Sequence, residues 1–349
     1  MGCLSERYKI KLQEEIPEVD SFFGVNDLQN IIRHIGGSWK SDLVGERKLT
    51  SPSHYSYLKI AEGCDRKCAF CAIPLIRGKH ISRPFEEVVS EAEKLVKSGV
   101  KEINVISQDT TCYGLDLYKK RRLPELLAEM AQISGLEWIR LHYTYPDGFP
   151  GEILEVIKNY PNICDYIDIP LQHISDRILK SMRRGITGTQ TRRLIEKIRK
   201  IIPGVTIRTT LIVGYLGETA AEFRELKKFV EESRFDRMGV FAYSHEEDTA
   251  AFKLKDSVTA RIKKQRCEEL MAIQEKISHD LNAAKLGQWV KVIIDRKEGE
   301  FYIARTAGDS PEVDNEVLIA RGNLQLDTGS FCDVRITKAD NFDLYAELK

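Results

Sequence analysis

The amino-acid sequence predicts an α/β protein: an open partial barrel of six βα units, followed by a small all-β barrel. In the middle of the 349-residue chain, short apolar runs alternate with helical patterns. Such alternation favours a parallel, barrel-like sheet with its active site at the carboxyl ends of the strands. After residue 286 the helical patterns stop and short strands follow one another, which is typical of an OB-like barrel.

Each expected strand of the first barrel is a short, largely apolar run with β-branched or aromatic members. Six strands, rather than the eight of a closed barrel, would leave one side open, which suits a large substrate. The six runs are Tyr57–Ala61, Glu102–Ser107, Trp138–Thr144, Tyr166–Leu171, Thr206–Val213 and Met238–Tyr243.

The helices between the strands carry the usual start and stop signals. One is expected over Pro84–Ser98, with proline at its start and Gly99 after its end. Thr219 and Glu222 have the spacing of a capping box ahead of another helix. A long helix over residues 258–286, stopped by glycine, is expected to connect the barrel at 51–257 to the C-terminal module at 287–349.

The C-terminal module alternates between strands and turns, and it is acidic. It carries eight Lys or Arg and twelve Asp or Glu, although the whole chain has 53 of each kind. An acidic module matches a basic partner better than it matches a polyanion such as RNA, although a small surplus of acid also serves solubility. Its expected strands are Trp289–Asp295, Glu300–Thr306, Glu316–Ala320, Ser330–Lys338 and Leu344–Leu348.

A cysteine loop follows the first expected strand. Cys64, Cys68 and Cys71 have the spacing C-x3-C-x2-C, with no fourth cysteine close by. A structural zinc site closes its coordination with four ligands, whereas an iron–sulfur cube held by three thiolates keeps one iron free for another ligand. The alternatives are a zinc site with a remote fourth ligand, such as His80, and scattered buried thiols.

The other cysteines and the apolar residues indicate the cellular compartment of the protein. The other cysteines are dispersed through the chain, without the regular spacing of a secreted disulfide framework, and this favours a reducing cytoplasm. The chain has no run of about 20 apolar residues, so no membrane partner is expected.

Polar residues follow the second expected strand, on the rim where the cysteine loop should lie. Gln108, Asp109 and Thr110 are candidates for ligand binding there. The simpler interpretation is that they cap a helix.

Later strand ends add further candidates. Gln172 and His173 end the fourth strand, where the histidine is either a core residue or part of the cleft. Arg208 lies on the fifth strand, and because an internal arginine is costly without a partner, a ligand carboxylate is a natural one. Gly214 and Gly217 follow that strand and would permit close approach of the backbone to a ligand.

Together these features resemble the radical S-adenosylmethionine (SAM) methylthiotransferases over nearly the whole chain, with a TRAM domain at the OB-like module. The resemblance rests on the cysteine loop with Phe70, on Gln108–Gly114, on the Tyr145-Pro146 pair and on Asp168–His173. It implies a [4Fe-4S] cluster whose free iron binds SAM. The strand-end candidates would then contact SAM. This chain departs from the family in having Leu216 where proline is usual.

Within that family, the motifs are most similar to the enzymes that modify small-subunit ribosomal protein twelve. The resemblance implies that SAM serves as methyl donor and radical source, and that a methylthio group is added to the β-carbon of an aspartate. An electron-donor protein is an implied partner. The tRNA-modifying relatives usually have Gln-Asn where this chain has Gln108-Asp109. A tRNA methylthiotransferase and a non-catalytic, zinc-binding RNA or ribosome module remain the alternatives.

The family has a second [4Fe-4S] cluster in an N-terminal methylthiotransferase domain. Cys3 resembles the third of its three cysteine ligands, and Ile16–Asp20 resembles the end of that domain. Residues 1–50 are therefore expected to be a remnant of that domain and a linker. We expect one cluster in this chain, where the full-length family has two, and SAM cleavage without completed methylthiolation.

Overall fold

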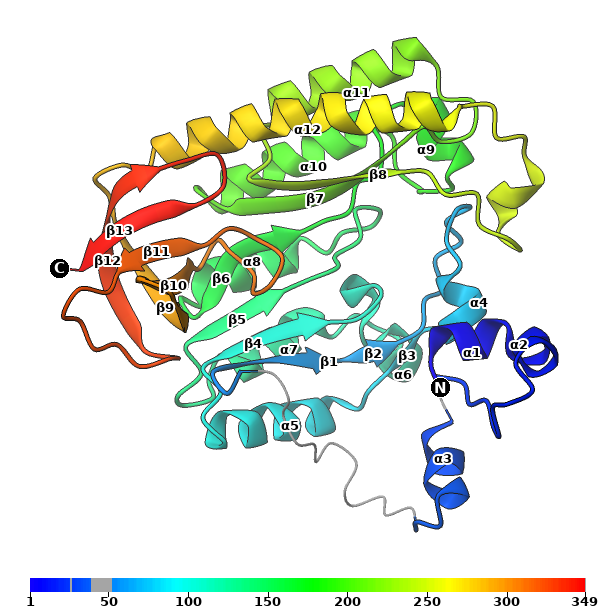
Figure 1. The fold of residues 1–349 in the computed structure, drawn as a ribbon, viewed down its shortest axis with the longest axis horizontal. Coiled ribbons are helices and arrows are strands. Elements are labelled where there is room, and N and C mark those ends of the chain that lie inside the picture. The colour runs from blue at the N-terminus through cyan, green and yellow to red at the C-terminus, as the bar shows by residue number, and fades with distance from the viewer. Residues whose placement is uncertain (26, 39–51, 349) are drawn as a thin grey trace.

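The chain forms a six-stranded parallel sheet, as the sequence predicts. The computed structural model describes residues 1–25, 27–38 and 52–348. The strand order is sequential, β1-β4-β5-β6-β7-β8, so each βα unit adds its strand beside the previous one (Figure 1). These strands are β1 (Tyr55–Lys59), β4 (Glu102–Ile106), β5 (Trp138–Leu141), β6 (Ile163–Asp168), β7 (Thr206–Val213) and β8 (Arg237–Ala242).

Helices follow the strands, and the longer ones bury apolar side chains in the core of the sheet. The expected capping box at Thr219 and Glu222 is confirmed at the start of α11. A second one, at Thr187 and Gln190, starts α10. The helices are α4 (Ile73–Arg77), α5 (Phe85–Lys97), α6 (Leu115–Tyr118), α7 (Leu123–Met130), α8 (Glu152–Asn159), α9 (Asp176–Ser181), α10 (Gly188–Ile201), α11 (Ala220–Ser233) and α12 (Ala260–Ala283).

Four further short elements belong to this domain. The strands β2 (Ala61–Glu62) and β3 (Ile81–Ser82) form an antiparallel pair that frames the cysteine loop. Two 3-10 turns, η2 (Thr110–Cys112) and η3 (Ala250–Lys253), lie after β4 and β8.

The C-terminal module is a closed barrel with its own apolar core. Its strand order is β10-β11-β13-β12-β9, and buried Val292, Ile319 and Ile336 belong to that core. All five strands lie close to their predicted positions: β9 (Trp289–Glu298), β10 (Phe301–Thr306), β11 (Val317–Ala320), β12 (Phe331–Ala339) and β13 (Leu344–Leu348).

The small barrel sits against the amino ends of the large sheet's strands, at the end of the molecule opposite the N-terminal helices (Figure 1). Trp138, the first residue of β5, packs edge-on against Phe331 of β12, with ring centroids 4.9 Å apart. Helix α12 crosses from the large sheet to the small barrel, where Asn282 donates to the carbonyl of Phe342. The loop between β10 and β11 enters the large barrel from this end, since Tyr55 bonds Glu312 there.

A buried ionic network joins the two barrels. Glu102 of β4 accepts from Arg140 Nε at 3.0 Å and from Arg305 Nη2 at 2.8 Å. Arg305 also bonds Asp295, which contacts His54 at 2.8 Å. Burial alone would raise the pKa of Glu102, but the two guanidinium groups hold that pKa below its usual value. The carboxylate is therefore ionised in the interface.

Part of the acidic surplus of the C-terminal module is paired with arginines of the large barrel and is therefore not on the surface. Asp309 pairs with Arg237 of β8, with its oxygen 3.0 Å from Nε, and Asp314 lies 3.3 Å from Arg208 Nε. Both carboxylates are buried. A basic partner would therefore meet less negative charge than the sequence suggests.

The N-terminal segment lies at the carboxyl end of the large sheet, beside α4 (Figure 1). It contains α1 (Cys3–Arg7), α2 (Lys9–Glu15) and α3 (Leu28–His34). Much of the expected linker up to residue 50 lies outside the described residues. Among the helices that the structure describes, none is long and apolar enough to cross a membrane.

Candidate functional site

The cysteine loop lies at the carboxyl end of the large sheet, between β2 and α4. Backbone bonds hold it on both sides: Cys64 N donates to Gly78 O at 3.1 Å, and Ala69 N donates to Met182 O at 2.9 Å. All three thiols are free and partly exposed. The loop therefore presents its sulfur atoms to the barrel mouth from a fixed backbone.

All three cysteines line one recess of about 580 Å³, as do strand-end residues from across the barrel. Predicted Gln108 and Gln172 are among them, as the strand-end argument requires. The other lining residues are Arg66, Phe70, Ile73, Tyr143, Thr144, Tyr145, Pro170 and Arg184.

Two arginines lie against the ring of a tyrosine beside Cys68. The guanidinium carbons of Arg66 and Arg184 lie 3.9 and 4.2 Å from the ring centroid of Tyr145. The Tyr145 hydroxyl is 3.3 Å from Cys68 Sγ, and Arg184 Nη1 donates to the same sulfur at 3.3 Å. Arg66 pairs with Asp109 at 2.8 Å, whereas Arg184 has no carboxylate partner among residues 52–348.

The donor set fits an anionic iron–sulfur cluster. Burial raises the pKa of Cys64 to about 11 and also raises the pKa of Cys71, so these thiols lose their protons only when a metal replaces them. The buried cation of Arg184 favours the resulting negative charge. In the part of the chain that the structure describes, no three His, Cys, Asp or Glu side chains converge on one point, as a single zinc ion would require.

Three residues that line the recess also carry buried polar atoms that have no partner within the described residues. The amide oxygens of Gln108 and Gln172 and the Nε of Arg184 make no hydrogen bond in the structure. Unsatisfied groups of this kind are costly in an apolar interior. They fit a ligand that offers both donors and acceptors, as the amino and carboxylate groups of SAM do.

Asp109 and Thr110 lie beside the recess and do not line it. Asp109 accepts from Thr111 N at 3.0 Å and so caps η2, which is the simpler interpretation of this residue. It also pairs with Arg66. Thr110 donates from its hydroxyl to His142 O at 2.9 Å and from its amide to Tyr143 O at 3.1 Å. Both residues thus orient others that do line the recess.

His173 and the glycines form a buried cluster behind the recess. His173 Nδ1 accepts from Ser175 N at 3.0 Å, and its Nε2 lies 3.7 Å from Glu218 Oε1. Glu218 also accepts from the Gly214 amide. A Cβ on Gly214 would lie 2.3 Å from Lys263 Cγ of α12, so this glycine permits close approach of a helix. Gly217 has φ +70°, which favours glycine in that turn.

Arg208 finds its carboxylate partners within the protein. Its Nη1 is 3.2 Å from Asp168 Oδ1, and its Nε is 3.3 Å from Asp314 Oδ1. It lies below the recess, on the side of the C-terminal module. The sequence favoured a ligand carboxylate as the partner of Arg208, whereas the structure pairs this arginine with two carboxylates of the protein itself.

Arg184 and Tyr143 are among the recess residues that the sequence reasoning missed. Arg184 lies in the loop between α9 and α10, where an arginine pair looks like an ordinary solvated surface. Tyr143 follows β5 with a positive φ of 54°, which the sequence does not signal. Gln172 also has a positive φ, of 73°. Such backbone conformations in non-glycine residues are often found at functional sites.

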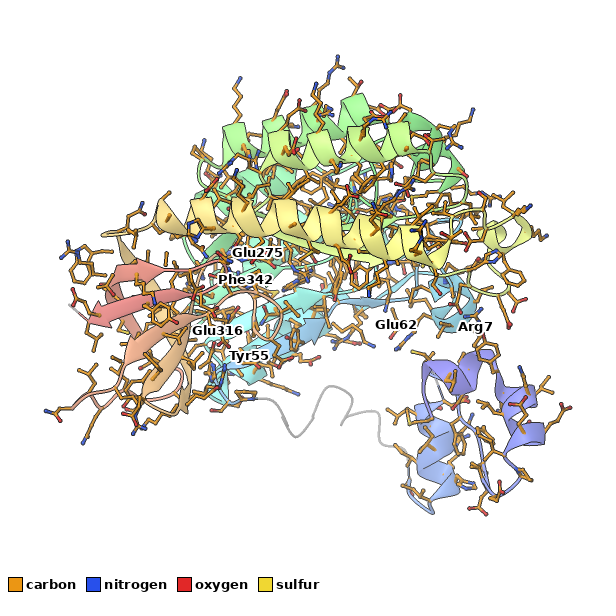
Figure 2. The ribbon with its side chains drawn as sticks, turned by 45° about the horizontal axis from the view of Figure 1, so that its top comes forward. Arg7, Tyr55, Glu62, Glu275, Glu316 and Phe342 are labelled. Atoms are coloured by element: carbon orange, nitrogen blue, oxygen red, sulfur yellow. The ribbon has the colours of Figure 1, made fainter. Side chains whose placement is uncertain are left out.

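A second recess, of about 940 Å³, opens beside the first, and Arg7, Cys71 and Phe241 are among its lining residues. Figure 2 shows Arg7 and Glu62 at this end of the molecule, far from Tyr55 and Glu316. Cys3 is exposed, and its sulfur accepts from Arg77 Nη2 of α4 at 3.1 Å. The N-terminal segment thus lines the approach to the cysteine loop.

Two family models match the chain. The radical SAM superfamily matches residues 58–230, and the TRAM domain matches residues 286–348. The cobalamin-dependent SAM radical enzyme OxsB, solved with aqua-cobalamin and SAM, has a similar fold. It is 13% identical at a TM-score of 0.50, over 79% of this chain and 43% of that one.

Close relatives match almost the full length. The ribosomal protein uS12 methylthiotransferase RimO of Flavobacterium johnsoniae is 57% identical over 99% of this chain and 79% of its own length. Those of Christiangramia forsetii and Phocaeicola vulgatus are 56% and 54% identical, covering 77% and 81% of their lengths and 99% and 100% of this chain. The chain therefore belongs to the RimO family of radical SAM methylthiotransferases.

Proposed function

We propose that the reaction served by this protein is the addition of a methylthio group to the β-carbon of an aspartate in ribosomal protein uS12, and that residues 52–348 hold the radical SAM site of that reaction. The observation that carries the proposal is one recess lined by three partly exposed thiols, by two glutamines and by a buried arginine that has no carboxylate partner among the described residues. The choice of uS12 as the substrate is supported by the relatives, which are named as uS12 methylthiotransferases and are up to 57% identical to this chain.

Cys64, Cys68 and Cys71 would hold a [4Fe-4S] cluster. When bound, it supplies the electron that cleaves SAM to a 5′-deoxyadenosyl radical, which can take hydrogen from an unactivated carbon. The protein's own contribution is electrostatic and steric. Arg184 and the Tyr145 hydroxyl hydrogen-bond Cys68, and the bonds to Gly78 and Met182 fix the loop.

Gln108, Gln172 and Arg184 would bind the polar end of SAM, because each lines the recess and has a buried side-chain atom without a partner among the described residues. We expect Asp109, Thr110, His173, Arg208, Gly214 and Gly217 to support this binding from behind, through the contacts described above. Cys3 is a candidate ligand of a second cluster, and its position beside α4 would bring that cluster to the same mouth.

A protein substrate would reach the site through the recess beside Phe241. Phe241 is 61% exposed on the edge strand β8, where the open barrel leaves its gap. An apolar side chain in such a position gives a substrate loop a surface to contact. A ribosomal substrate and free thiols both fit a reducing cytoplasm, and an electron-donor protein is a further expected partner.

The proposal is tested by comparing substrates in a SAM-cleavage assay. Reconstituted protein is incubated with SAM and a reductant, alone, with uS12 or with tRNA, at physiological salt. We expect uS12 to stimulate formation of 5′-deoxyadenosine and tRNA to leave it unchanged. Stimulation by tRNA alone, with binding that weakens steeply as salt rises, would instead identify a tRNA methylthiotransferase.

A further inference from the structure

The loop between β10 and β11, residues 307–315, reaches from the C-terminal module to the underside of the recess. Asp314 Oδ2 accepts from the Tyr166 hydroxyl at 2.7 Å and from Ser310 N at 2.9 Å. Ser310 Oγ contacts His142 Nε2 at 3.0 Å. A Cβ on Gly308 would lie 2.6 Å from Thr206 Oγ1, so the loop is closely seated.

The groups that this loop contacts converge on one carboxylate. Arg208, held by Asp314, lies 3.2 Å from Asp168 Oδ1, and His142 Nδ1 lies 3.5 Å from Asp168 Oδ2. Asp168 is fully buried. Burial would raise the pKa of Asp168, but the bond from His142 and the charge of Arg208 hold that pKa below its usual value. The carboxylate is thus ionised between the loop and the recess.

Asp168 in turn holds the wall of the recess. Its Oδ2 accepts from Tyr143 N at 3.1 Å, and its backbone oxygen accepts from Thr144 N at 2.9 Å. Tyr143 has φ +54°, which is unfavourable for a bulky side chain and persists only where surrounding bonds impose it. Tyr143 and Thr144 both line the recess with the three cysteines.

We propose that loop 307–315 positions the SAM-binding wall of the recess through Asp168. Ser310 and Asp314 fix His142 and Arg208, these orient the Asp168 carboxylate, and that carboxylate keeps Tyr143 in its left-handed conformation. The C-terminal module is then a part of the catalytic pocket's support as well as a separate domain. The SAM part of this inference rests on the proposed function, whereas the link from the loop to Tyr143 does not.

The same loop offers a matched control. Asp309 is buried like Asp314 and pairs with an arginine of the large barrel, but that arginine is Arg237 of β8, which does not contact Asp168. If the loop only docks the two domains, Asp309→Asn and Asp314→Asn should have equal effects on the recess. If the path through Asp168 operates, only Asp314→Asn should alter Tyr143.

The first test is hydrogen–deuterium exchange of a peptide spanning Tyr143, measured by mass spectrometry on the full chain. Losing a buried, charge-assisted bond should let this amide open more often, so we expect about tenfold faster exchange in Asp314→Asn. Ser310→Ala should give a smaller change in the same direction, and Asp309→Asn should match the wild type at Tyr143. If Asp314→Asn does not fold, the exchange rate at Tyr143 in Ser310→Ala, compared with that in Asp309→Asn, tests the proposal.

The second test is the affinity for SAM of the reconstituted protein, measured by equilibrium dialysis. We expect the Kd for SAM to rise at least about threefold in Asp314→Asn and to stay unchanged in Asp309→Asn. Equal changes in both variants, or in neither, would overturn the proposal, as would faster exchange without any loss of SAM affinity. A wild-type chain that binds no SAM would contradict the proposed function instead, while the exchange test would still decide the link.

Discussion

Removing the charge of Glu102 should weaken the junction between the two barrels. Its carboxylate is 0% exposed and accepts from Arg140 at 3.0 Å and Arg305 at 2.8 Å. In Glu102→Gln the side chain keeps its volume, but two buried guanidinium groups lose their shared anion. Breaking a buried ion pair on one side costs about 3 to 5 kcal/mol. We expect the lower end, since the amide oxygen still accepts one bond and Arg305 keeps Asp295.

Urea unfolding followed by circular dichroism measures this loss, with Glu137→Gln as the matched control. Glu137 also forms an ion pair between the barrels, with Lys291 at 3.2 Å, but both side chains are about half exposed. Such a pair contributes at most about 1 kcal/mol. A Glu102→Gln variant whose free energy of unfolding lies within about 1 kcal/mol of the wild type would refute the reasoning.

Three further predictions follow from single contacts. Arg184→Gln removes the cationic donor 3.3 Å from Cys68 Sγ, so the cluster should be harder to reduce: about tenfold less reduced cluster at a fixed potential, equal to about 59 mV for one electron. Redox titration followed by electron paramagnetic resonance measures this, and an unchanged midpoint in a fully loaded variant would contradict it. The lowered pKa of Glu102 means that its ionised form stabilises the fold above its unfolded pKa of about 4.3, and that this stability is lost as pH falls through the lower folded value. The urea concentration at the unfolding midpoint should therefore decrease as the pH is lowered from about 7 to about 3, and it should decrease less in Glu102→Gln than in the wild type. Equal decreases in the two proteins would contradict this prediction. Gly214→Ala places a Cβ 2.3 Å from a side-chain carbon of α12 at φ +68°, so it should cost at least about 1 to 3 kcal/mol in urea unfolding. Gly204→Ala, at φ +81° with open space around it, should lose only the stability that the backbone strain costs. Equal losses of stability in the two variants would show that the contact with α12 is unimportant.

The strands and the cysteine loop could be predicted because their signals are local. Apolar runs with β-branched residues fixed β4 and β7 to within a residue of their observed bounds, and the C-x3-C-x2-C spacing lies within one loop. Gln108 and Gln172 were found because carboxyl ends of parallel strands share a rim. In each case a single stretch of sequence carries the information.

The rest depends on contacts between distant segments. Arg184 reaches Cys68 across 116 residues, and it looks like a surface residue until the fold buries it. Arg140 and Arg305 interrupt apolar strands, and only the docked barrels reveal Glu102 as their common partner. Charged residues in strand interiors carry no local signal for the partner that they will meet.

The central claim is that the recess directs a SAM-derived radical to an aspartate of uS12. It is tested most directly with uS12 that carries deuterium on the aspartate β-carbon, incubated with reconstituted protein, SAM and a reductant. Mass spectrometry of the 5′-deoxyadenosine should then show incorporated deuterium, and none with Cys68→Ala. This readout does not require sulfur insertion. Abundant 5′-deoxyadenosine without deuterium, from uS12 that binds the protein, would contradict the account.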